Sequence, residues 1–154
     1  MNEHLRQKTD ELIERAGRAV IGVFPNPGDT DVNHAFCYSI GNAAKGLPEI
    51  LIVGLFDQAG TAIINDLSAR MLERGRALDH GELVDLGGTF PICIIEASEA
   101  VKEIYTVQAT NYFCHQEYEV LQAVMCDKEG RFPWDKGCAA PYGKVIVYQR
   151  RANA

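Results

Sequence analysis

Ala35-Phe-Cys-Tyr-Ser-Ile-Gly-Asn-Ala-Ala-Lys-Gly-Leu-Pro-Glu-Ile-Leu-Ile-Val-Gly-Leu55 joins two strand-like runs through a loop of small and polar residues. In the first run, residues 34–40, large side chains alternate with small ones, which predicts a strand with two different faces. The second run, residues 49–56, follows Pro48 and is continuously apolar, which is typical of a strand at the centre of a sheet. This pair of strands is the core around which the remaining elements are placed.

The remaining apolar patterns predict further strands and helices on both sides of this segment. Leu5, Leu12, Ile13 and Ala16 fall on one face of a helix over residues 3–16. Asp57 is a typical N-cap for a helix that ends at Gly75, and Ser98 for a helix over 99–111. Further strands are expected at residues 18–24, 90–96, 118–126 and, as an edge strand, 144–148, with a weak strand near Leu83 and Val84.

The order of these elements predicts an α/β (α+β) fold: a mixed, largely antiparallel sheet with two to three helices packed on it. At 154 residues the chain is expected to form a single domain, 1–154. Within it the N-terminal helix covers 3–16, the core about 17–134 and the edge strand about 144–148.

Composition and charge disfavour several classes of function. With 15 basic and 21 acidic residues the formal charge is −6, which disfavours nucleic acid and anionic membranes as partners. The N-terminus lacks the apolar core of a signal peptide and no apolar run is long enough to span a membrane, so a cytoplasmic location is expected. Five cysteines without Cys-x-x-Cys spacing predict reduced thiols, and no metal site is expected.

Two motifs in the opening segment resemble functional signatures but lack essential parts. Gly41-Asn-Ala-Ala-Lys-Gly46 is followed by Pro48 and a strand, whereas a phosphate-binding loop needs Lys followed by Ser or Thr and a helix. Ser39 has a glycine two residues after it and none two residues before it, so the sharp turn of a hydrolase nucleophile is missing. Neither motif predicts a reaction.

A set of polar side chains flanks the central strands: His34, Tyr38, Ser39, Asn42 and Glu49. These residues are expected to gather at one edge of the sheet. Glu49 stands just before a buried strand, where loss of water would raise its pKa and suit it to acid or base chemistry. The alternative is an ordinary glutamate in solvent at the start of a strand.

A second candidate feature is Phe132-Pro-Trp-Asp135, which places the only tryptophan on a proline-stiffened loop. An indole held in this way can close a pocket or anchor a partner, and it can equally fill the bottom of the core. Gln122 lies inside an apolar run, so its amide needs hydrogen-bond partners within the fold.

Three functional hypotheses follow from these residues. The leading one is a noncatalytic domain that binds a small molecule or a protein, because no nucleophile with its base is recognisable. Its expected ligand-binding residues share a predicted hollow: Tyr38, Ser39, Asn42, Glu49, Trp134 and Asp135. The second is an enzyme acting on a soluble metabolite, with Glu49 or His34 as general base and Tyr38 as acid or oxyanion donor. A flavin is a possible cofactor of this enzyme, because the small strand face of Ala35, Cys37 and Ser39 would admit its ring.

The third hypothesis is an acidic interaction protein of the immunity type, whose negative charge attracts a basic protein partner. The chain is also expected to form a homo-oligomer.

The sequence also resembles a bacterial family described as a domain of unknown function, of the DUF4262 type. The resemblance rests on five ordered elements within about residues 17–134: Ala19-Val-Ile-Gly-Val-Phe24, Ala35-Phe-Cys-Tyr-Ser-Ile-Gly41, Leu47-Pro-Glu-Ile-Leu-Ile-Val-Gly-Leu55, Leu121-Gln122, and Asp127 followed by Gly130-Arg-Phe-Pro-Trp134. Where the family usually has Trp-Pro before that aspartate, this chain has Met125-Cys126. The resemblance implies a shared fold and a shared pocket, and no substrate.

Overall fold

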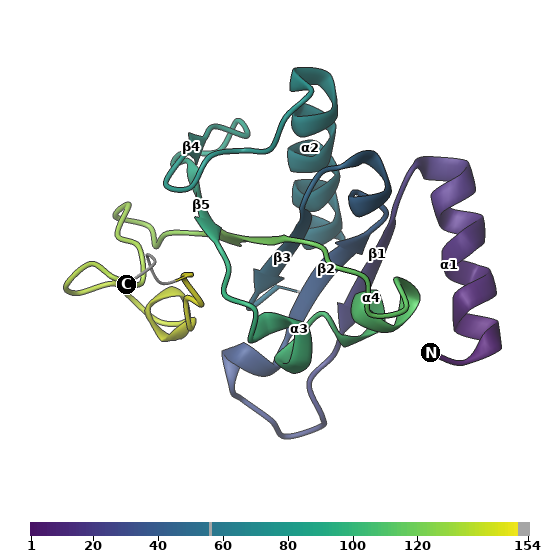
Figure 1. The fold of residues 1–154 in the computed structure, drawn as a ribbon. Coiled ribbons are helices and arrows are strands. Elements are labelled where there is room, and N and C mark those ends of the chain that lie inside the picture. Colours follow the sequence, from purple (N-terminus) through teal and green to yellow (C-terminus); the bar gives the residue numbers. More distant parts are fainter. Residues whose placement is uncertain (56, 151–154) are drawn as a thin grey trace.

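The computed structural model describes residues 1–55 and 57–150, which form one α+β domain around a six-stranded sheet (Figure 1). The order across the sheet is β1-β2-β3-β6-β5-β4. Only β3 and β6 pair in parallel, while the other neighbours are antiparallel. The predicted mixed, largely antiparallel sheet is therefore confirmed. The strands are β1 (Ala19–Val23), β2 (Phe36–Ile40), β3 (Glu49–Val53), β4 (Leu83–Val84), β5 (Ile92–Glu96) and β6 (Val120–Val124).

β3 is the central strand, as the apolar run predicts. All five of its residues are buried, and it lies between β2 and β6. β2 pairs with it in antiparallel register, Tyr38 opposite Leu51. The predicted strand reached residue 56, but β3 ends at Val53, and Phe56 lies outside the described residues. Gly54 follows at φ +95°, a left-handed conformation that ends the extended run.

Two long helices begin and end at the predicted residues, and capping contacts fix their ends. In α1 (Glu3–Ala16) the Asn2 side chain accepts the backbone N–H of Leu5 at 2.8 Å. In α2 (Gln58–Arg74) the Asp57 carboxylate accepts the backbone N–H of Ala59 at 3.0 Å. Both helices end at a left-handed glycine. α1 lies beside β1 at one end of the sheet, and the C-terminal region lies at the other end (Figure 1).

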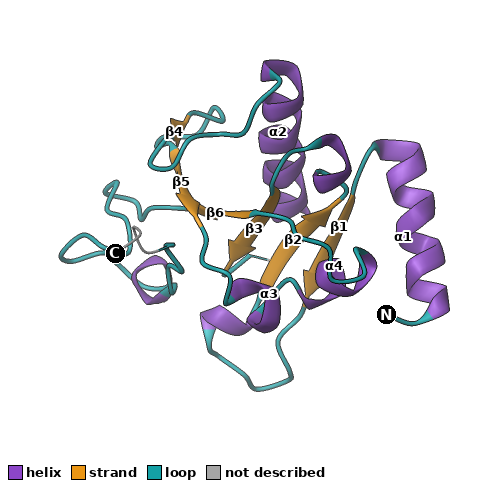
Figure 2. Cartoon of the chain, viewed as in Figure 1, coloured by secondary structure: helices purple, strands orange, loops and turns teal. Residues whose placement is uncertain are grey.

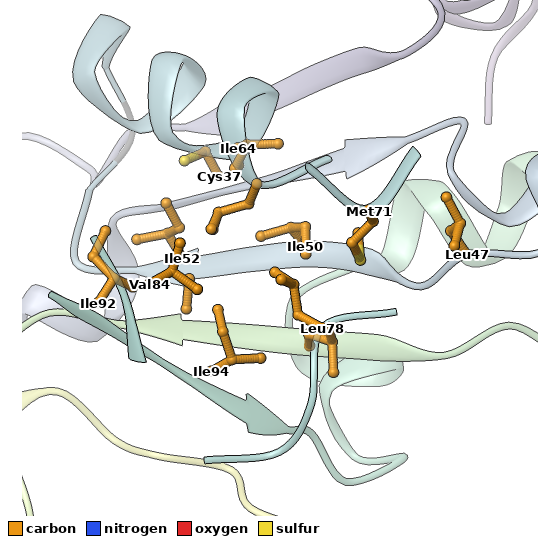
Figure 3. Packing of buried hydrophobic residues seen from close by; sticks show 13 residues of the cluster. Cys37, Leu47, Ile50, Ile52, Ile64, Met71, Leu78, Val84, Ile92 and Ile94 are labelled. Carbon is orange, nitrogen blue, oxygen red and sulfur yellow. The ribbon is translucent and has the colours of Figure 1, made fainter. Parts of the chain in front are cut away.

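The sheet carries a separate apolar cluster on each face. On one face the helix α2 packs Ile64, Leu67 and Met71 against the strands. Figure 3 shows Ile64 and Met71 beside Ile50 and Ile52 of β3. On the other face, Val101, Tyr105 and Ala109 of two short helical segments cover Tyr38 and Leu51. None of the helices in the described part of the chain is both long and apolar enough for a membrane crossing.

The expected helix over 99–111 is wrong in detail, because the chain forms two short helices, α3 (Val101–Ile104) and α4 (Val107–Tyr112). Between them Thr106 is fully buried, and its Oγ1 lies 2.8 Å from the hydroxyl oxygen of Tyr118. This contact with a residue beyond the helix bends the chain away from a continuous helix. Ser98 is not the cap: the N-cap position is Ala100, and the Ser98 backbone N–H donates to the carbonyl of Tyr148.

The expected edge strand at 144–148 is also wrong. Lys144 ends a short 3-10 helix, η3 (Tyr142–Lys144), and the extended residues after it form only an isolated bridge between Gln149 and Ala97. Figure 2 shows the resulting long irregular segment after β6. This segment is bound by the side chain of Gln122. The Nε2 of Gln122 donates to the Ile146 carbonyl at 2.9 Å, and its Oε1 accepts the Tyr148 N–H at 2.9 Å. The Gln122 amide, which was predicted to need partners, thus makes the two backbone hydrogen bonds that a neighbouring strand would otherwise make.

Candidate functional site

The carboxylate of Glu49 is completely buried and accepts four hydrogen bonds. Its Oε1 accepts the Ser39 hydroxyl at 2.7 Å and the Asn42 N–H at 3.2 Å, and its Oε2 accepts the Gly41 and Ala43 N–H groups at 3.1 and 2.9 Å. Burial raises the pKa of Glu49, and these four donors act in the opposite direction. The side chain therefore organises the loop that was expected to form a pocket around it.

Asn42 and Ser39 belong to the same buried network. The Asn42 amide donates to the Pro48 carbonyl at 3.1 Å and to the Ser68 hydroxyl of α2 at 2.9 Å, and its oxygen accepts Nε of Arg18 at 3.3 Å. The structure thus brings Ser39, Asn42 and Glu49 together, as expected. Their polar atoms are engaged with one another and with the backbone.

Tyr38 lies on the other face of the sheet, in the cluster covered by α3 and α4. Its ring is buried, and its hydroxyl accepts the Gln108 backbone N–H at 3.2 Å. Burial raises the pKa of this phenol above its ordinary value. The geometry gives it the role of a core residue that fixes the start of α4.

His34 lies in an exposed 3-10 turn, η1 (Val32–His34), rather than in strand β2. Its Nδ1 is 2.6 Å from Asp29 Oδ2, and its Nε2 is 3.5 Å from Asp31 Oδ2. The hydrogen bond and charge of Asp29 raise the pKa of His34. Both ring nitrogens face carboxylates, so neither is directed at an incoming proton donor.

Trp134 is half exposed and stacks on Phe132, with ring centroids 5.0 Å apart. The tryptophan lines a shallow groove with Ile95 and Val147, and none of the partners of Glu49 lines that groove. Asp135 accepts the Phe132 backbone N–H at 2.8 Å and thereby holds the turn. The single hollow expected to unite Glu49 with the indole is therefore not formed, and the indole does not fill the core.

A larger cleft is lined by other residues that follow β6, and we name it the Phe90 cleft. It has a volume of about 510 Å³. Most of its walls are apolar, and a few polar groups line it, which is the usual composition of a small-molecule site. Its lining residues come from α2, the segment before β5, the end of β6 and η3: Ile63, Leu86, Gly88, Thr89, Phe90, Pro91, Ile92, Met125, Cys126, Asp127, Lys128 and Tyr142.

Asp127 fixes the loop that forms one wall of this cleft. Its Oδ1 accepts the backbone N–H groups of Glu129 and Arg131 at 2.9 and 2.8 Å, and its Oδ2 accepts that of Ala139 at 2.8 Å. These three hydrogen bonds lower the pKa of the Asp127 carboxyl group, and the bond from Ala139 has the largest effect. Gly130 has φ +80°, and a Cβ there would lie 2.9 Å from the Phe90 ring, so only glycine allows the loop to pass this close.

The small strand face proposed to admit a flavin is closed by α2. Cys37 and Ser39 are completely buried, and a Cβ on Gly60 of α2 would lie 2.6 Å from the Cys37 sulfur. Burial also raises the pKa of Cys37 to about 12, so this thiol is inert. Among the residues that the structure describes, no three His, Cys, Asp or Glu side chains lie close enough to hold a metal ion.

The chain is thus a single α+β domain with an apolar cleft beside a loop that the Asp127 carboxylate fixes. The model of a family described as "Domain of unknown function (DUF4262)" matches residues 12–139, and the chain belongs to this family, as the sequence resemblance indicated. No curated protein and no solved structure gives a significant match.

Sequence reasoning missed the Phe90 cleft because its walls come from segments far apart in the chain. Asp127 followed by Gly130 does indicate a tight turn, and the resemblance also includes both residues. No local pattern indicates that this turn packs against Phe90.

Proposed function

We propose that this chain is a noncatalytic binding domain for a small molecule, which it holds in the Phe90 cleft. One observation carries the proposal: an apolar cleft of about 510 Å³ lies against a loop whose backbone is fixed by three hydrogen bonds to Asp127. Because this wall is ordered before binding, the loss of conformational entropy on binding is smaller.

The state of the acid and base candidates favours binding over catalysis. Both oxygens of Glu49 are occupied by internal donors, and both ring nitrogens of His34 face carboxylates. Neither residue lines the Phe90 cleft. A general base needs a free atom within hydrogen-bond reach of its substrate.

Trp134 and Asp135 stay predicted ligand-binding residues. Trp134 lines the shallow groove with Ile95 and Val147, where its exposed indole would stack on a flat ligand. Self-association, a basic protein partner and a cytoplasmic location stay predictions from the sequence.

The test is chemical-shift mapping by ¹H–¹⁵N NMR with the neutral probe 4-phenylbutanol. We expect saturable shifts at residues of the Phe90 cleft, and recovery of the probe chemically unchanged. Met125→Trp, which adds bulk inside the cleft, should abolish these shifts. Thr89→Phe at the rim provides a second blocking variant should Met125→Trp fail to fold.

The matched control is Leu72→Trp, because Leu72 is half exposed on α2 and does not line the cleft. This variant should bind as the native chain does. Shifts scattered over the surface, or cleft shifts that survive both blocking variants, would refute the proposal.

A further inference from the structure

We infer that the Phe90 cleft selects an amphipathic anion: a small organic acid whose carboxylate is joined to one aromatic ring or a branched alkyl body. This inference rests on the proposed function and names the chemical class of its ligand. It follows from which polar groups of the cleft are already engaged within the fold and which are not.

The walls of the cleft set the apolar part of the ligand. Phe90 and Pro91 form one side, and Ile63 and Met125 contribute further apolar surface. Phe90 is 39% exposed, although it packs over Gly130, so part of its ring is available to a ligand. Covering this surface removes apolar area from water and favours a ring or a branched chain.

The two charged residues of the cleft differ in their availability. Asp127 is only 3% exposed and its oxygens accept three backbone N–H groups, so little of its carboxylate is available for direct contact with a ligand. Lys128 is exposed and makes no ion pair within residues 1–55 and 57–150. The ammonium group of Lys128 is therefore the more accessible charged group of the cleft, and it attracts an anion and repels a cation.

The uncharged polar groups of the cleft add hydrogen-bond donors. Thr89 and Tyr142 are among its lining residues, and neither hydroxyl group makes a hydrogen bond to any residue in the described part of the chain. A carboxylate has about four acceptor sites and can use both hydroxyl donors together with the ammonium group. An alcohol of the same shape can use fewer of these donors, so the acid is the preferred ligand.

The experiment compares three probes with the same body: 4-phenylbutyrate, 4-phenylbutanol and 4-phenylbutylammonium. Affinities are measured by the NMR titration above on the full chain. We expect the acid to bind about fivefold more tightly than the alcohol, the advantage expected for one exposed charge pair, and the ammonium probe to bind most weakly. Added salt should weaken binding of the acid and leave that of the alcohol unchanged.

The decisive variant is Lys128→Met, which should remove the advantage of the acid and leave the affinity for the alcohol unchanged. Its control is Lys136→Met, since Lys136 is an exposed lysine of the same loop that does not line the cleft. Equal affinities for acid and alcohol in the native chain would overturn the inference while the proposed function stands. If no probe produces cleft shifts, both are overturned.

Discussion

The hydroxyl of Ser39 donates to Glu49 Oε1 at 2.7 Å and accepts the backbone N–H of Ile50 at 2.9 Å. One side chain of β2 thus fixes both the carboxylate and the first residue after it in β3. The carboxylate also accepts the backbone N–H groups of Gly41 and Ala43, so it holds the loop between the two central strands in a folded conformation. We interpret this arrangement as the structural reason for a glutamate at the start of the most buried strand.

Replacing Glu49 with alanine should destabilise the fold strongly. The change leaves two buried backbone N–H groups, of Gly41 and Asn42, and the partly buried one of Ala43 without an acceptor. Removing one partner of a buried charged network typically costs about 3 to 5 kcal/mol. Urea unfolding followed by circular dichroism measures this loss. Glu49→Gln should cost less, because it keeps one carbonyl acceptor, although its amide hydrogens oppose the loop N–H groups.

Glu119→Gln serves as the control for Glu49, because Glu119 is a glutamate next to β6 with a side chain that is 70% exposed. Its unfolding free energy should stay within about 0.5 kcal/mol of the native value. A Glu49→Ala variant that is as stable as this control would show that the loop does not depend on the carboxylate.

The hydrophobic pattern was sufficient to predict the six strands of the sheet and the two long helices, although it also predicted a strand at 144–148 that does not form. It did not predict the contacts of the polar side chains that organise the connections. The apolar run predicted β3, and the capping residues Asp57 and Gly75 predicted α2. Both predictions succeeded because each element depends on residues that are close in sequence. The break at Thr106 depends on the hydroxyl of Tyr118, which follows 12 residues later. A local pattern contains no information about such a partner.

The candidate site was predicted only in part for the same physical reason. Ser39, Asn42 and Glu49 come together because β2 and β3 form a hairpin, which the sequence indicates. Whether their polar atoms face solvent depends on how the intervening loop folds, and the loop N–H groups turn inward. Trp134 could not be placed, because its loop is held by Asp127 and Asp135 through contacts with the backbone.

Gln122 should hold the C-terminal segment against the sheet. Gln122→Leu keeps the approximate size of the side chain but loses both hydrogen bonds, to Ile146 and Tyr148, and leaves these backbone groups without partners. We expect a loss of about 1 to 3 kcal/mol in the free energy of unfolding and faster amide hydrogen exchange at Tyr148.

The comparison for Gln122 is Gln116→Leu, since Gln116 is exposed and its side chain makes no hydrogen bond to the described residues. This change should leave exchange at Tyr148 as it is. Unchanged protection at Tyr148 in Gln122→Leu would mean that the bridge between Ala97 and Gln149 is enough to hold the segment.

His34 should titrate above its ordinary pKa of 6.5, because Asp29 is hydrogen bonded to the protonated ring. A pKa that is raised by folding stabilises the native state fully below pH 6.5, and this contribution is lost as the pH rises through the raised pKa. The gap in melting temperature between the native chain and Asp29→Asn should therefore be larger at pH 5.5 than at pH 9.

NMR titration of the His34 ring measures the pKa directly. Asp29→Asn should lower it, and Asp31→Asn should lower it less, because Asp31 is 3.5 Å from the ring and Asp29 is 2.6 Å from it. An unchanged pKa in Asp29→Asn would contradict the interpretation that this carboxylate controls the histidine.

Asp127 should control the order of the loop between the cleft and the groove. Asp127→Ala removes the acceptor for three backbone N–H groups, whereas Asp135→Ala removes the acceptor for one. We therefore expect limited proteolysis within residues 128–139 to become faster in both variants, and much faster in Asp127→Ala. Because the pKa of Asp127 is lowered in the fold, the native loop should lose its protection as the pH falls below the ordinary value of 3.8. Equal cleavage rates in the two variants would show that the three bonds to Asp127 do not fix the wall of the Phe90 cleft.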